Sequence, residues 1–135
     1  MSASNVDLIR DSWARWNSGD RESLLDQIDP DVEIRVSSSQ VSGGEAYRGH
    51  DGYREWIATM DEAFDVWEIF PETFRERGET VLVLGHMHLR GRGSGVEFDQ
   101  ETGWIVEARD GIMLRMQSFL SHADAVAAFS EDRVE

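Results

Sequence analysis

The chain has 135 residues, 40% of them hydrophobic, and 13 basic against 27 acidic side chains give a formal net charge of −14. This length is typical of one domain with its own core, and the charge argues against partners such as nucleic acid or an anionic membrane surface. With zero cysteines, the chain cannot form disulfides or use thiolate chemistry, and a reducing, cytoplasmic location is expected. The N-terminus lacks a signal pattern and no apolar run approaches the length of a membrane span. We expect a single domain over 1–135, with frayed ends at 1–3 and 130–135.

The first third of the chain predicts two helices and one strand. Residues 4–18 have apolar side chains at helical spacing, namely Leu8, Ile9, Trp13 and Trp16. Asp20 can cap a second helix, which Pro30 is expected to stop. Residues 32–36 alternate apolar with charged side chains, as a half-buried strand does. Residues 37–49 are polar and rich in serine and glycine, so a mobile loop is expected there.

The rest of the chain predicts one helix, four strands and a short closing helix. The helix starts near Asp51 and carries one apolar stripe, formed by Tyr53, Trp56, Ile57, Met60 and Phe64. Glycine-containing turns separate the strand-like runs, which cover 66–77, 80–92, 96–109 and 112–120. Residues 122–129 form the closing helix. Helices followed by a long antiparallel meander are typical of the α+β class.

Two histidines are the best chemical clue in the chain. His86 and His88 lie two residues apart in an apolar run, and a strand directs residues i and i+2 to the same side. A turn at Gly93-Ser94 places His88 opposite Asp99 and His86 opposite Glu101, whereas a turn at Ser94-Gly95 shifts the pairs but keeps the same face. An imidazole beside a carboxylate can transfer protons near neutral pH, or it can be a cross-strand polar pair that only stabilises the sheet.

The second hairpin then assigns the two faces of the sheet. A turn at Asp110-Gly111 places Ile105 opposite Met116, which groups Met116 and Leu120 with the two histidines. That face mixes apolar and ionisable groups, as ligand pockets do. The opposite face, which includes Trp104, is apolar too, and we expect it to be covered by a second copy of the chain in a homodimer.

Four segments carry a resemblance to a known family. They are NSGD at 17–20, DPDVEI at 29–34, YRGHDGYREWI at 47–57 and ARDGIMLRMQSFLSHADAVAAF at 108–129. Together they resemble the SnoaL-like proteins of the nuclear transport factor 2-like superfamily, over nearly the whole chain. The resemblance implies an α+β cone, in which a curved antiparallel or mixed sheet wraps around the N-terminal helices and leaves a pocket at its open end. Members include polyketide cyclases, ketosteroid isomerases, epoxide hydrolases, dehydratases and proteins with no known activity.

The catalytic residues of these relatives mostly have no counterpart here. At the positions that match the ketosteroid isomerase residues, the aspartate base is replaced by Val36 (or Arg35), the protonated aspartate by Ile105 and the tyrosine by Ser12. The aspartate of SnoaL-type cyclases has its nearest candidate in Asp99, by its predicted facing. The Asp-Arg-Asp set of epoxide hydrolases cannot be placed.

The sequence therefore predicts a protein with a pocket for a small apolar ligand and no cofactor. The candidate catalytic residues are His86, His88, Asp99 and Glu101, which would act in a cyclase, isomerase or hydrolase reaction. The alternative is a non-catalytic module of the same fold that binds a small molecule or interacts with a partner. A metal is not expected, because two adjacent ligands without a third at fixed spacing are a weak motif. Candidate ligand-binding residues are Tyr53, Trp56, Met60, Met116 and Leu120.

Overall fold

The computed structural model describes residues 5–38 and 41–132. Three α-helices, one 3₁₀ helix and six strands follow one another in these residues: α1 (Asn5–Asn17), η1 (Glu22–Gln27), β1 (Ile28–Ser38), β2 (Val41–Arg48), α2 (Gly49–Ala63), β3 (Phe64–Arg77), β4 (Thr80–Gly91), β5 (Glu97–Arg109), β6 (Ile112–Phe119) and α3 (His122–Asp132).

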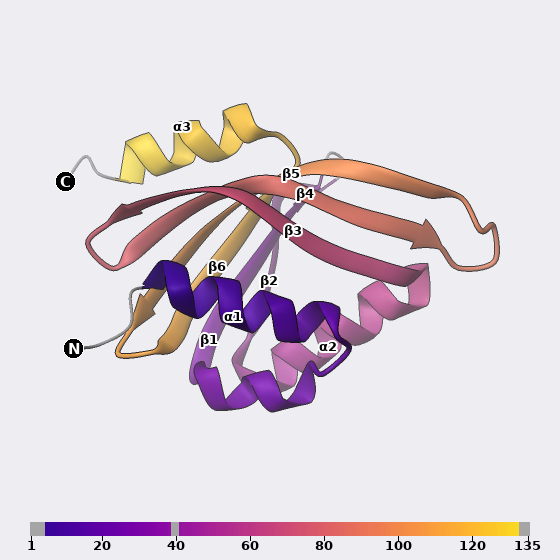
Figure 1. The fold of residues 1–135 in the computed structure, drawn as a ribbon, viewed down its shortest axis with the longest axis horizontal. Coiled ribbons are helices and arrows are strands. Elements are labelled where there is room, and N and C mark those ends of the chain that lie inside the picture. The colour runs from indigo at the N-terminus through magenta and orange to yellow at the C-terminus, as the bar shows by residue number, and fades with distance from the viewer. Residues whose placement is uncertain (1–4, 39–40, 133–135) are drawn as a thin grey trace.

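One mixed sheet organises the fold, with the strand order β2-β1-β6-β5-β4-β3. β1 and β6 run parallel, and every other neighbouring pair is antiparallel. The sheet curves, with α1, η1 and α2 on its inner face and α3 on its outer face (Figure 1). The predicted α+β cone with a curved sheet around the N-terminal helices is confirmed.

The segment between the first two long helices differs from the prediction. The sequence predicts a helix that Pro30 stops. The structure has instead the short 3₁₀ helix η1, which ends at Gln27, and Pro30 lies inside β1. Proline fits there because the pairing of β1 with β6 is irregular between Ile28 and Glu33, so its missing N–H leaves no ladder hydrogen bond unmade.

The loop predicted at 37–49 is also wrong over most of its length. β2 occupies Val41–Arg48 and pairs with β1 at the edge of the sheet, for example Ile34 with Tyr47. Backbone hydrogen bonds hold an edge strand whatever its side chains are, so a polar sequence can pair there. Residues 39–40 lie outside the described residues.

The two predicted hairpins differ in outcome. In the first, His88 pairs with Asp99 and His86 with Glu101, which confirms the predicted register. In the second, Arg109 pairs with Ile112 as predicted, but a bulge next to Ala108 then shifts the register by one residue. Because a one-residue shift moves side chains to the other face, Met116 lies opposite Val106 instead of Ile105.

Two separate cores lie on the two faces of the sheet. The inner core packs α1, η1 and α2 against the sheet, and Trp104 is part of it, only 2% exposed. The prediction that Trp104 belongs to a homodimer interface is therefore wrong: helix α1 of the same chain covers that face, since Trp13 contacts Trp104. The smaller outer core joins α3 to the sheet through Leu82, Ile105, Phe119, Ala125 and Phe129.

At the C-terminal end α3 continues through Asp132, so residues 130–132, predicted to be frayed, are helical. Residues 1–3 and 133–135, the rest of the predicted frayed ends, lie outside the described part of the chain. Among the residues that the structure describes, no helix is both long and apolar enough to cross a membrane.

Candidate functional site

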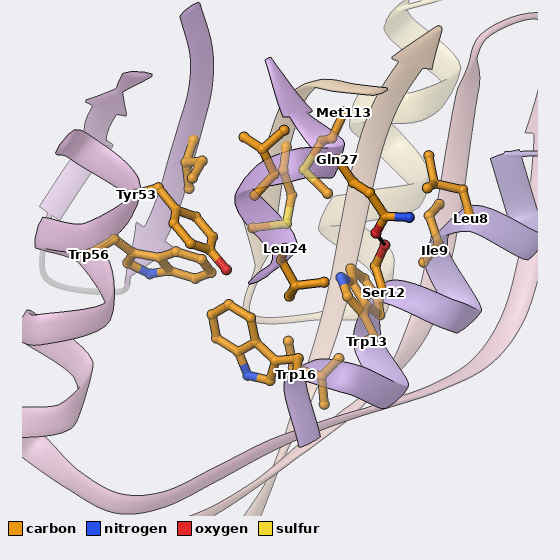
Figure 2. A pocket seen from close by; sticks show the side chains of 14 residues that line it. Leu8, Ile9, Ser12, Trp13, Trp16, Leu24, Gln27, Tyr53, Trp56 and Met113 are labelled. Carbon is orange, nitrogen blue, oxygen red and sulfur yellow. Dashed lines mark hydrogen bonds between the residues drawn. The ribbon is translucent and has the colours of Figure 1, made fainter. Parts of the chain in front are cut away.

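An apolar pocket lies between the helices of the inner face and the sheet. Tyr53 and Trp56 of α2 lie on one side of it and the side chains of α1 on the other, as Figure 2 shows. The free volume inside is about 30 Å³, which is enough for a water molecule but not for an organic ligand, so a ligand would enter only if side chains move. The lining residues are Leu8, Ile9, Ser12, Trp13, Trp16, Leu24, Gln27, Ile28, Ile34, Tyr53, Trp56, Ile69, Met113 and Met116.

An aromatic wall lines part of this pocket, formed by Trp16 of α1 together with Tyr53 and Trp56 of α2. The ring centroid of Trp16 lies 5.3 Å from that of Trp56 and 6.1 Å from that of Tyr53. The Tyr53 hydroxyl donates a hydrogen bond to the backbone oxygen of Arg21 at 3.0 Å. Burial raises the pKa of Tyr53 above its ordinary value, and the nearby charge of Arg21 only partly offsets this. The hydroxyl is therefore a neutral group, suited to positioning and not to proton transfer near pH 7.

A polar cluster interrupts the lining on the α1 side. The Gln27 Oε1 atom accepts hydrogen bonds from the Ser12 hydroxyl at 2.9 Å and from Arg15 Nη2 at 2.7 Å. Arg15 lies one turn after Ser12 on α1, while Gln27 is the last residue of η1. The cluster thus joins the two helical segments and presents polar groups to an apolar cavity.

Leu8 and Gln27 lie at the boundary of the pocket. Both also line an open depression of about 550 Å³ on the protein surface. The other residues of this depression are mainly polar, and it contains the ion pair between Glu79 and Arg109. The apolar pocket and the open depression therefore adjoin at Leu8 and Gln27, and we call this boundary the mouth of the pocket.

The predicted ligand-binding residues fall into two groups. Tyr53, Trp56 and Met116 line the pocket. Met60 is half-buried and packs against the inner core without lining the pocket. Leu120 follows β6 and is 40% exposed, so its predicted place in the pocket is wrong. Met116 lies there for a different reason from the predicted one, because the bulge next to Ala108 turned it to the inner face.

The two histidines lie on the outer face of the sheet, not in the pocket. His88 bonds Asp99 through Nδ1 at 2.7 Å and Glu97 through Nε2 at 2.8 Å. His86 bonds Glu72 at 2.9 Å, and both imidazoles are about one-third exposed. The predicted orientation toward a pocket is therefore wrong. Alternation along β4 shows which side chains share a face, but it does not show which face the helices cover.

The predicted acidic partners share this outer position. The Glu101 carboxylate accepts a hydrogen bond from the backbone N–H of His122 at 2.7 Å, at the start of α3. The hydrogen bond to Asp99 is the main cause that raises the pKa of His88, followed by the one to Glu97. No group of three or more metal-ligating side chains is arranged to hold an ion within 5–38 and 41–132. The catalytic role of His86, His88, Asp99 and Glu101 stays a prediction.

Two polar residues of the pocket were not among the predicted site residues. Ser12 falls within the buried stripe of α1 between Ile9 and Trp16. A hydroxyl on an apolar stripe indicates a polar group inside the protein, so it could have pointed to the pocket. The resemblance had placed it at the tyrosine position of ketosteroid isomerases. Gln27 carries no such signal, because its partner Arg15 belongs to a separate helical segment.

Comparison with known proteins identifies the family. The model of the SnoaL-like domain matches residues 9–116. The chain belongs to this family. A comparison of this SnoaL-like chain with curated protein sequences finds no match.

Solved structures share the fold of this SnoaL-like protein. A nuclear transport factor 2-like protein of unknown function from Burkholderia pseudomallei K96243 is 20% identical, with a TM-score of 0.77 over 93% of this chain and 96% of that one. TerC co-crystallized with polyporic acid is 25% identical, with a TM-score of 0.77 over 96% of this chain and 97% of that one. IdmH from Streptomyces antibioticus, proposed to be a polyketide cyclase, is 20% identical, with a TM-score of 0.69 over 93% and 97% of the two chains.

Proposed function

We propose that this SnoaL-like protein binds a small, flat, largely apolar molecule in the pocket between α1, α2 and the sheet. The observation that carries the proposal is the aromatic wall of the pocket, where the ring of Trp16 from α1 meets those of Tyr53 and Trp56 from α2. Aromatic side chains offer broad apolar surfaces with preferred stacking geometries, so they favour ligands with ring systems.

The small free volume is compatible with this role. Leu8 and Gln27 separate the interior from the open depression, and both are side chains with several rotatable bonds. A ligand that displaces the Leu8 side chain gains the apolar contacts of the lining, while Gln27 keeps its hydrogen bonds to Ser12 and Arg15. The likeness to TerC, which was co-crystallized with polyporic acid, supports an organic ligand for this fold.

The acid–base reaction predicted from the histidines is not part of this proposal. His86, His88, Asp99 and Glu101 are absent from the described pocket lining, so a cyclase, isomerase or hydrolase reaction that uses them would need a substrate on the outer face. The function supported best is binding, with the polar groups of the pocket orienting the ligand.

Chemical-shift mapping tests the proposal without any mutation. Fluorene, a flat tricyclic hydrocarbon, is titrated into ¹⁵N-labelled protein. We expect the indole N–H signals of Trp13, Trp16 and Trp56 to shift, because all three line the pocket. The backbone signals of His86 and His88 on the outer face are the internal control and should stay in place.

Two results would overturn the proposal. One is the absence of any saturable shift with either fluorene or its ketone, 9-fluorenone. The other is a set of shifts that centres on β4 around His86 and His88 and leaves the pocket indoles unchanged.

A further inference from the structure

Gln27 occupies a special position, because its side chain belongs both to the apolar pocket and to the outer depression. In Figure 2 its amide nitrogen lies on the side of Leu8, while its oxygen meets the Ser12 hydroxyl. A ligand that enters from the depression would therefore pass this amide.

The hydrogen bonds determine which end of the amide is available. Arg15 has only N–H donors, so the Gln27 atom at 2.7 Å from its Nη2 must be the carbonyl oxygen. The Ser12 hydroxyl donates to the same oxygen. Among the described residues, no acceptor is bonded to the two N–H groups on Nε2, and they remain free to donate.

We infer that Gln27 donates from Nε2 to a carbonyl oxygen of the bound molecule and so selects ligands with a neutral carbonyl group at the end nearest the mouth. The inference rests on the proposed function and adds the chemical class of the ligand. Arg15 and Ser12 are positioning residues, since they hold the amide with its donor side toward the ligand. The charge on Arg15 also polarises the amide and strengthens its N–H donors.

The surroundings favour a neutral acceptor over an anionic one. The depression next to Gln27 is lined by Asp7, Asp11, Glu79 and Asp110, and its single described cation, Arg109, already holds Glu79 with two hydrogen bonds at 2.8 and 3.0 Å. The whole chain carries a net charge of −14. A ligand carboxylate at the mouth would meet repulsion, whereas a ketone oxygen would not.

A matched pair of ligands and a matched pair of variants test this inference. 9-Fluorenone and fluorene share one flat ring skeleton and differ by a carbonyl oxygen. Wild-type protein should bind 9-fluorenone about three- to tenfold more tightly than fluorene, the gain from one hydrogen bond. Gln27→Glu keeps the acceptor for Arg15 and Ser12 but has no N–H donor, so this preference should disappear.

Gln117→Glu is the control variant. It makes the same chemical change beside Ile105 and Ala128 on the outer face, so it should retain the preference of the wild type. Gln27→Met, which also lacks the donor, gives the same readout if the glutamate variant does not fold. The melting temperature of each variant reports whether the fold is intact.

The outcomes separate this inference from the proposed function. Equal binding of the two compounds by the wild type, with shifts at the pocket indoles, overturns the inference and leaves the pocket function intact. A preference that survives in both Gln27 variants also overturns it. If neither compound binds the wild type, the proposed function fails and the inference falls with it.

Discussion

The indole rings of Trp13 and Trp104 meet in the inner core with their centroids 4.8 Å apart and their planes tilted by 59°. The two residues are 3% and 2% exposed and come from α1 and β5. This contact joins the first helix to the middle of the sheet, and Trp13 also lines the apolar pocket.

Replacing Trp104 with alanine should strongly destabilise the protein. The substitution removes the ring that supports Trp13 and leaves a large cavity, so the free energy of unfolding should fall by about 3–5 kcal/mol. Urea unfolding of the purified variant measures the loss. Val96→Ala, at a position 60% exposed, is the control and should stay within about 0.5 kcal/mol of the wild type. A loss of less than about 1 kcal/mol for Trp104→Ala would contradict the structure.

Gly103 should tolerate no side chain while α3 is docked on the outer face. A Cβ atom at this position would lie 2.4 Å from the Cβ atom of Ala125, closer than real contacts allow. Gly103→Ala should therefore cost about 1–3 kcal/mol of stability in a urea titration. The double variant with Ala125→Gly should recover part of it, although glycine in a helix itself costs about 1 kcal/mol. Additive losses in the double variant would show that the two residues do not meet.

The His88–Asp99 pair should make stability depend on pH. The pKa of His88 is raised in the folded state, first by Asp99 and then by Glu97. The protonated imidazole therefore stabilises the fold fully below the ordinary pKa of about 6.5, and this contribution is lost as the pH rises through the folded-state value. NMR titration should give a lower pKa for His88 in Asp99→Asn than in the wild type.

Stability measurements check the same pair independently. The free energy of unfolding of the wild type should exceed that of Asp99→Asn, and this difference should be larger near pH 6 than near pH 9. The two pH values lie on opposite sides of the expected titration of His88. An equal difference at the two pH values would mean that the pair does not interact as the structure shows.

Tyr53 should stay protonated in the folded protein well above its ordinary pKa of about 10. Because burial raises its folded-state pKa, its contribution to stability is complete below the ordinary pKa of about 10 and is lost as the pH rises from there through the folded-state value. Wild-type protein should therefore lose stability above about pH 10 more steeply than Tyr53→Phe. At neutral pH the variant should lose about 0.5–1.5 kcal/mol, since its hydrogen bond to the Arg21 oxygen is absent. Tyr47→Phe is the control, and an identical alkaline decline in all three proteins would contradict the prediction.

The sequence predicted most elements because their signals are local. The helical spacing of Ile9, Trp13 and Trp16 leads directly to the buried stripe of α1. The pairing of His88 with Asp99 followed from the residues between the strands, although four residues, 92–95, and not two, separate the innermost bonded pair of Gly91 and Val96. The longer loop adds one unpaired residue on each side of the predicted turn, so the remaining pairs across the hairpin stay the same.

The tertiary structure decided what the local signals left open. The bulge next to Ala108 turned Met116 toward the pocket, and a two-residue turn signal does not report a bulge in the strands that the turn joins. Gln27 became a pocket residue because η1 brings it to Arg15 across a separate segment of chain. Contacts of this kind depend on how elements pack, not on spacing within one of them.

The sequence by itself determined the α+β class and which side chains of β4 and β5 share a face, since these follow from local periodicity and turn chemistry. The family followed from the resemblance of four segments of the chain. It did not determine which face is inside. Both faces of β4 and β5 are apolar enough to be buried, and α1 and α2 cover the face of Trp104 while His86 and His88 stay outside. That choice depends on the sum of many packing contacts between distant segments, which is why the pocket emerged around Trp16, Tyr53 and Gln27 instead of around the histidines.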